Sequence, residues 1–254
     1  MDSPIGSFLL LITLLTTYNG FIRRDFFEKY LFQVDKILYQ KERYRLFSSG
    51  FLHANWLHFG FNMIALISFS WALEFTLGYL SFLLIYFVAM LGGNLLALYI
   101  HRNHGDYSAI GASGAISGVV MSSIVLFPES KIGIILLPFI EFPSWIFGLL
   151  FIVVSLFGIK SQRDNIGHEA HLGGAITGLI LTVLIRPSIA LSNWWVILLM
   201  LVPTVGFLWL IIKHPDFLIT GKFRKPNLKI VHSKVRSKSK HNKTAKTQPR
   251  LNLK

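Results

Sequence analysis

Residues 111–118 read GASGAISG, a run of small residues between two long apolar stretches. Small residues spaced four apart, here Gly114 and Gly118, allow two membrane helices to approach closely. A serine held between glycines can instead be a nucleophile when a base lies beside it. The residues around this stretch must therefore decide whether Ser113 packs helices or carries out catalysis.

The composition is that of an integral membrane protein. Of 254 residues, 53% are hydrophobic and only 15% are charged, whereas about a quarter are charged in soluble domains. The chain has no cysteine, so it has neither disulfides nor thiolate metal ligands. The first apolar run, 7–22, lacks a basic leader and a small-residue cleavage site, and we expect a retained membrane helix.

We predict an all-α polytopic membrane domain over residues 1–212. Segment 113–127 is short and starts at a glycine-rich loop, so we expect it to begin below the membrane surface, surrounded by protein or by a water-filled cavity. Segment 131–143 is apolar but contains Pro138 and Pro143, which favour an interfacial loop. The expected membrane helices are 7–22, 56–73, 80–100, 113–127, 144–159, 169–186 and 193–212.

The basic charge of the chain is confined to residues 213–254. This segment holds 13 Lys and Arg and one acid, whereas residues 1–212 hold 12 basic and 11 acidic residues. Its low apolar content predicts a disordered tail. Contact with anionic lipid headgroups and a purely solubilising role are both open for the tail, and we expect no nucleic-acid binding.

Polar side chains gather at the starts of the second, fourth and sixth predicted helices. His58 and Asn62 are four residues apart and share one helix face, with His53 at its mouth. Ser113 begins the fourth helix, and His171 lies in the first turn of the sixth. Alternate crossings run in the same direction, so the three clusters lie on one side of the membrane. Polar groups there are costly, and we expect one functional site.

A second pair of glycines spaced four apart, Gly174 and Gly178, follows His171 in the sixth predicted helix. If this glycine stripe faces the stripe formed by Gly114 and Gly118 in the fourth helix, the two backbones approach closely. Ser113 then comes within hydrogen-bond reach of His171. A base beside a serine hydroxyl is what nucleophilic catalysis requires.

Attack on a peptide carbonyl also needs donors for the oxyanion. The backbone N–H of Ser113, at a helix start, has no intrahelical partner. The amide of Asn62 and the ring N–H of His58 are further candidate donors.

At these residues the chain resembles the rhomboid family of intramembrane serine proteases. Three stretches occur in the family's order: YRLFSSGFLHANWLHFGFNM (44–63), GASGAISG (111–118) and AHLGGAITG (170–178). The resemblance implies a six-helix core, to which 193–212 adds a further helix, and no metal or cofactor. It implies a Ser113–His171 dyad, an oxyanion hole from His58, Asn62 and the Ser113 N–H, and supporting roles for His53, Gly111, Gly114, Gly174 and Gly178.

The chain departs from the family pattern at specific positions. Many members carry an aromatic residue four positions after the nucleophile, stacked on the catalytic histidine, where this chain has Ser117. A hydrogen bond or another ring would then hold the histidine. Tyr44 replaces the tryptophan that precedes the family's loop arginine, here Arg45. His168, one turn before His171, is either a partner of the site or a polar residue at the membrane surface.

Other polar residues have simpler interpretations. We expect His101 and His104 to be solvated loop residues, and Glu169 to be a surface or helix N-terminal acid. His168 and His171 are three residues apart, whereas the zincin motif needs four. A zinc site made of His53, His58 and His171 remains an alternative.

The resemblance implies an endopeptidase that cleaves peptide bonds in or near transmembrane helices of other membrane proteins. Two alternatives remain: a rhomboid-like protein that binds such helices without cutting them, and a small transporter with histidine relays.

We expect a multi-pass protein, in the cell membrane if the source is bacterial. With the N-terminus in the cytoplasm, as the family implies, seven crossings place the basic tail outside, against the positive-inside rule. Either the tail is outside or one segment does not cross.

Overall fold

The computed structural model describes residues 3–134, 137–161 and 166–214. The chain divides into two compact units, Met1–Thr220 and Gly221–Lys254. The second unit, and with it nearly all of the predicted basic tail at 213–254, lies outside the described residues.

The apolar segments predicted to cross the membrane are all helical, with ends within a few residues of the expected ones. Two of the apolar helices, α7 (Ser113–Leu126) and α8 (Ser144–Ser161), are short, and the four-residue α10 (Ile189–Ser192) leads into the last long helix. Those long and apolar enough to span a bilayer are α1 (Pro4–Ile22), α5 (Trp56–Leu77), α6 (Tyr79–Ile100), α9 (His168–Ile185) and α11 (Trp194–Lys213).

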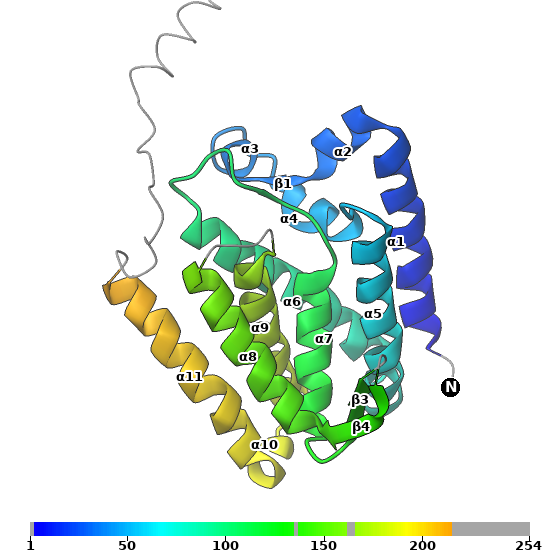
Figure 1. Ribbon diagram of the computed structural model, residues 1–254, viewed down its shortest axis with the longest axis vertical. Coiled ribbons are helices and arrows are strands. Elements are labelled where there is room, and N and C mark those ends of the chain that lie inside the picture. The colour runs from blue at the N-terminus through cyan, green and yellow to red at the C-terminus, as the bar shows by residue number, and fades with distance from the viewer. Residues whose placement is uncertain (1–2, 135–136, 162–165, 215–254) are drawn as a thin grey trace, which may run out of the picture. The chain divides into compact units, whose positions relative to one another are not determined.

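Helix α7 is the central helix of the bundle, with α5, α6, α8 and α9 around it (Figure 1). Every residue from Gly114 to Ser122 is buried. A short helix can begin below the membrane surface only where protein covers its free backbone groups, and this burial supplies that cover. Helices α5, α7 and α9 all run downward in Figure 1 and start at their ends nearer the top of the picture, so their polar first turns lie on one side.

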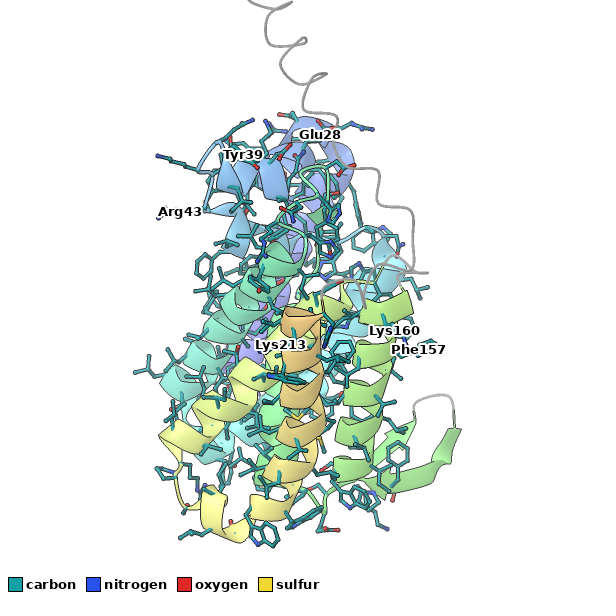
Figure 2. All side chains as sticks on the ribbon, turned by 90° about the vertical axis from the view of Figure 1, so that its left-hand side faces the viewer. Glu28, Tyr39, Arg43, Phe157, Lys160 and Lys213 are labelled. Carbon is teal, nitrogen blue, oxygen red and sulfur yellow. The ribbon has the colours of Figure 1, made fainter. Side chains whose placement is uncertain are left out.

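The segment 23–55 forms a cap over this end of the bundle, where Glu28, Tyr39 and Arg43 lie in Figure 2. Its short strand β1 (Phe32–Gln33) pairs antiparallel with β2 (Ser108–Ala109), two residues before Gly111. The cap therefore anchors the loop that leads into α7. Its helices are α2 (Arg24–Tyr30), α3 (Val34–Leu38), α4 (Arg45–Ser48) and the 3₁₀ turn η1 (Ser49–Phe51).

The prediction of a loop at 131–143 was wrong. The segment forms an antiparallel hairpin of β3 (Lys131–Ile134) and β4 (Leu137–Pro143), with a register shift at Gly133/Ile134. Proline is compatible with strands at their ends and beside irregularities. Pro143 is the last residue of its strand and Pro138 lies next to the shifted pair, so neither prevents pairing.

At the opposite end of the bundle a buried carboxylate joins α1 to α5. Glu74, near the C-terminal end of α5, accepts hydrogen bonds from the backbone N–H of Gly6, at 2.8 Å, and from the hydroxyl of Ser3. Both donors belong to the start of α1, where free N–H groups and the helix dipole favour a negative charge. Glu74 therefore stabilises the N-terminal end of α1. This role was not predicted from the sequence.

Candidate active site

Helices α7 and α9 touch through their backbones. A methyl group at Gly174 would collide with the carbonyl oxygen of Gly114, and one at Gly178 with that of Gly118. One turn further on, the hydroxyl of Ser122 donates to the carbonyl of Gly178 at 3.1 Å. The two glycine stripes thus face each other, and only residues without a Cβ allow helices this close.

The contact extends to the first turns of both helices. A methyl group at Gly114 would lie 3.3 Å from the carbonyl oxygen of Ala170. Gly114 follows Ser113 and Ala170 precedes His171, so the first turns that carry these two residues lie against each other. Both are partly exposed, whereas Gly114 and Leu172 beside them are buried. The start of α7 is therefore open where its interior is not.

The structure does not record the hydrogen bond expected between the two. Within the described residues, Ser113 Oγ makes no hydrogen bond, while the hydroxyl of Ser117 donates to the backbone carbonyl of Ser113 at 2.6 Å. Catalytic hydrogen bonds are commonly long without substrate and tighten in the bound complex. The structure therefore places the first turns of α7 and α9 together, but it does not show a hydrogen bond between Ser113 and His171.

His58 faces Ser113 across Gly111. A methyl group at Gly111 would lie 2.9 Å from His58 Nε2 and 3.7 Å from Ser113 Oγ, so the ring and the hydroxyl border the same space. Gly111 has φ +125°, a conformation that side chains rarely adopt. Its N–H donates to the carbonyl of Ser49 at 3.0 Å, which fixes the loop in place.

Asn62 lies one turn below His58 and is buried. Its side-chain nitrogen donates to the carbonyl of His58 at 2.9 Å, within its own helix. An amide NH₂ has two hydrogens, so one remains for another acceptor. Asn55 caps the helix by accepting from the backbone N–H of His58 at 2.8 Å, which holds the first turn of α5 in position.

His53 is buried rather than placed at the mouth of the site, with 1% of its surface exposed. Thr17 Oγ1 donates to the carbonyl of Phe51 and therefore accepts from His53 Nδ1, at 2.9 Å. The ring lies 4.9 Å from the His58 ring, centroid to centroid, in an edge-to-face arrangement. Burial lowers the pKa of His53 to about 3, so this ring is a neutral support for His58.

The prediction that His101 is solvated was wrong, because its side chain is buried. Glu169 is a helix N-terminal acid, one of the two predicted alternatives, and it is buried rather than at the surface. His101 Nε2 lies 3.0 Å from Glu169 Oε1, which joins the end of α6 to the first turn of α9. Tyr107 stacks on His101 with ring centroids 3.6 Å apart. His104 is partly buried beside them. In the sequence, His101 and Glu169 look like loop and surface residues, because the two segments that carry them lie far apart in the chain and meet only in the fold.

Helix α8 lies against the histidines of α9. His168 is buried, and a methyl group at Gly158 would collide with its ring. The ring of Phe151 lies 6.1 Å from that of His171, with 28° between their planes. Phe151 is thus a candidate for the ring that holds His171 in the absence of an aromatic residue at position 117, and it was not predicted from the sequence. No fixed spacing links that residue to the motifs.

Arg45 acts within the cap over the site. Its guanidinium is buried and donates to the backbone carbonyls of Leu31 and Glu28, at 2.6 and 2.9 Å, and to the carboxylate of Glu42 at 2.6 Å. The hydrogen bond from Arg45 lowers the pKa of Glu42. Tyr44 lies with its ring 5.6 Å from the guanidinium. The arginine thus ties α2 to α4 and is not directed at Ser113.

A metal site is not visible in the part of the chain that the structure describes. There, no three His, Cys, Asp or Glu side chains are grouped so that they could hold an ion, and the set His53, His58 and His171 is not such a group.

Comparison with known proteins agrees with these features. The model of the rhomboid domain matches residues 40–188. The mitochondrial rhomboid protein 1 of Saccharomyces cerevisiae is 31% identical over 159 residues, 61% of this chain and 45% of that protein. The mitochondrial presenilin-associated rhomboid-like protein A of Danio rerio is 30% identical over 136 residues (52% and 34%). The RHOMBOID-like protein 2 of Arabidopsis thaliana is 29% identical over 164 residues (60% and 46%).

The match spans less than half the length of each of these curated relatives. Within this chain the rhomboid-domain match, residues 40–188, covers all three sequence stretches of the candidate site and extends past the end of α9. The protein is an all-α, multi-pass membrane protein, and the chain belongs to the rhomboid family.

Proposed function

We propose that this protein is an intramembrane serine endopeptidase with Ser113 as nucleophile and His171 as general base. The observation that carries the proposal is the backbone contact between Gly114 and Ala170, which brings the first turns of α7 and α9 together. Family membership supports it, since the rhomboid family includes intramembrane serine proteases.

The proposed reaction is the hydrolysis of a peptide bond through an acyl-enzyme. Ser113 Oγ attacks a substrate carbonyl while its proton passes to His171, and the carbonyl oxygen becomes an oxyanion. The Ser113 N–H, His58 and the second hydrogen of the Asn62 amide are the donors available to stabilise it. The C–N bond then breaks, His171 gives its proton to the leaving amine, and water hydrolyses the acyl-enzyme by the same steps.

Hydrolysis requires water at a site inside the membrane. Ser113, His58 and His171 are all partly exposed, although α7 and α9 are buried immediately beyond Ser113 and His171. All three lie at the starts of α5, α7 and α9, the end of the bundle that the cap formed by 23–55 covers (Figure 1). We propose that water reaches Ser113 from this end.

The test is cleavage of a transmembrane model substrate by the purified protein in detergent. Ser113→Ala should abolish cleavage. Ser123→Ala is the matched control, since it removes a hydroxyl from the same helix more than two turns away. Cleavage that survives Ser113→Ala, or is lost equally in the control, would overturn the proposal.

A rhomboid-like protein that binds transmembrane helices without cutting them is the second candidate. It is favoured by the absence, within the described residues, of any hydrogen bond at Ser113 Oγ. The two functions differ in one property, the activation of the Ser113 hydroxyl. Binding of a substrate helix that is unaffected by Ser113→Ala, in a protein that cleaves nothing, would favour this candidate.

The partners we propose are transmembrane proteins as substrates and the surrounding lipid. The tail, rich in Lys and Arg, would add contact with anionic headgroups. The names of several relatives refer to mitochondria, and in a bacterial source the corresponding place is the cell membrane. Vesicle flotation with and without residues 215–254 tests the lipid contact: retention by anionic but not neutral vesicles should be lost with the tail.

A further inference from the structure

One side of α8 packs against both histidines of the first turn of α9. Phe151 lies beside His171, and Gly158, seven residues or about two turns later, lies under His168. The chain runs up α8 and down α9 (Figure 1), which matches the order of the two contacts. This side is distinct from the lipid side of α8, where Phe157 points outward and is 69% exposed (Figure 2).

The contact between Phe151 and His171 has the geometry of an aromatic pair. Ring centroids 6.1 Å apart with 28° between the planes lie within the range over which aromatic rings attract one another. On the other side, the ring of His168 meets that of His171 edge to face, at 5.9 Å. The imidazole of His171 is therefore bordered by a ring from α8 and a ring from its own helix.

Helix α7 does not supply a ring at this place. Ser117 is one turn after Ser113 and on the same side of the helix, and its small side chain is used to bond the backbone carbonyl of Ser113. A general base must be held in one orientation to accept a proton efficiently. Among the described residues, the aromatic neighbour of His171 that comes from another helix is Phe151.

We propose that Phe151 is a positioning residue for His171, which it holds by stacking from α8. The proposal rests on the function proposed above, in which His171 is the base. It has a consequence that helix packing alone does not have: the orientation of the base depends on where α8 stands. An outward displacement of α8 would remove the ring from His171 and slow the chemical step.

The test compares three substitutions in the full chain, assayed for kcat and KM with a transmembrane substrate. Phe151→Leu keeps an apolar side chain but removes the ring, and we expect kcat to fall roughly 10-fold or more with little change in KM. Phe151→Tyr keeps the ring and should retain kcat. Phe147→Leu removes a partly buried ring one turn earlier on α8, and we expect no change in kcat.

A double variant separates positioning from packing. Ser117→Tyr in the Phe151→Leu background offers a ring from α7, and we expect it to restore part of the lost kcat. Equal kcat in Phe151→Leu and Phe147→Leu would overturn the positioning role, and so would a loss in Phe151→Tyr as large as in Phe151→Leu. Ser113→Ala in the same assay separates the two proposals. If this variant is inactive, either of these results overturns only the role of Phe151 and leaves the proposed function standing. If it remains active, the proposed function itself fails.

Discussion

At the scale of single residues, the site depends on the absence of a side chain at Gly174. A methyl group there would meet the carbonyl oxygen of Gly114, which belongs to the backbone and cannot move aside without moving α7. The neighbouring contact of Gly114 with Ala170 is what brings Ser113 and His171 together. Under the proposed function, the serine and the glycines of residues 111–118 act together, because helix packing would create the proximity that catalysis needs.

We predict that Gly174→Ala separates α7 from α9 and lowers cleavage at least 10-fold, with a loss of stability of about 1–3 kcal/mol from overpacking. Gly206→Ala in α11 is the control, because a methyl group there meets nothing within 4 Å; alanine should be neutral or stabilising at this position. Cleavage rates and denaturation in detergent measure both effects. Wild-type activity in Gly174→Ala would contradict the packing described.

The buried His53 predicts a pH dependence of stability. Its pKa is 6.5 in an unfolded chain and about 3 in the fold, so protonation favours unfolding. The contribution is fully present above pH 6.5 and is lost as the pH falls toward 3. From pH 7 to pH 5 the loss amounts to about 2 kcal/mol. His53→Gln should flatten the dependence of the unfolding free energy on pH over this range; the same slope in variant and wild type would exclude His53 as its source.

At the scale of elements, the first turn of α9 is where the helices of the bundle meet. Its Ala170 carbonyl contacts Gly93 of α6 and Gly114 of α7, and His168 contacts Gly158 of α8. The buried pair of Glu169 with His101 adds a polar contact to α6. Contacts with α6, α7 and α8 thus fix the position of this turn and of His171. A base that accepts a proton from a residue of another helix requires such a fixed position.

We predict that Glu169→Ala destabilises the fold by about 3 kcal/mol, because it leaves His101 buried without its acceptor. Glu28→Ala is the control, since that carboxylate pairs with Arg24 at the exposed surface, where an ion pair contributes at most about 1 kcal/mol. Denaturation of both variants in detergent measures the difference. Equal stability of the two would show that the buried pair does not hold α9.

The helices could be predicted because each one shows a feature that is visible within a single stretch of sequence. Apolar length marks α1, α5, α6 and α11, and the spacing of glycines predicts the packing of α7 on α9. The hairpin at 131–143 was missed because its prolines have different meanings at strand ends and in strand centres. The pair of His101 with Glu169, and Phe151 beside His171, join residues that no periodic pattern relates, so only the tertiary structure reveals them.

At the scale of the whole molecule, the proposed reaction requires a substrate helix to present a peptide bond to Ser113, at the start of a helix enclosed by others. Carbonyls within an intact α-helix are hydrogen-bonded along the chain. The substrate must therefore unwind locally before Ser113 can reach its backbone, and the cost of unwinding depends on sequence.

We predict that transmembrane substrates with Gly or Pro near the cleavage site are cut at least several-fold faster than poly-Leu segments of equal length, because those residues weaken a helix. Competition between two labelled substrates in one liposome preparation measures the ratio, and unequal insertion is controlled by counting incorporated substrate. Equal rates would show that unwinding is not part of the reaction.

The central claim is that His171 activates Ser113, and labelling by a fluorophosphonate probe tests it most directly. With the folded full chain in detergent, followed by mass spectrometry, we predict one adduct per chain on Ser113, formed roughly 100-fold more slowly in His171→Ala. An intact protein that takes no label, or one in which Ser113 reacts equally fast with and without His171, would contradict the account.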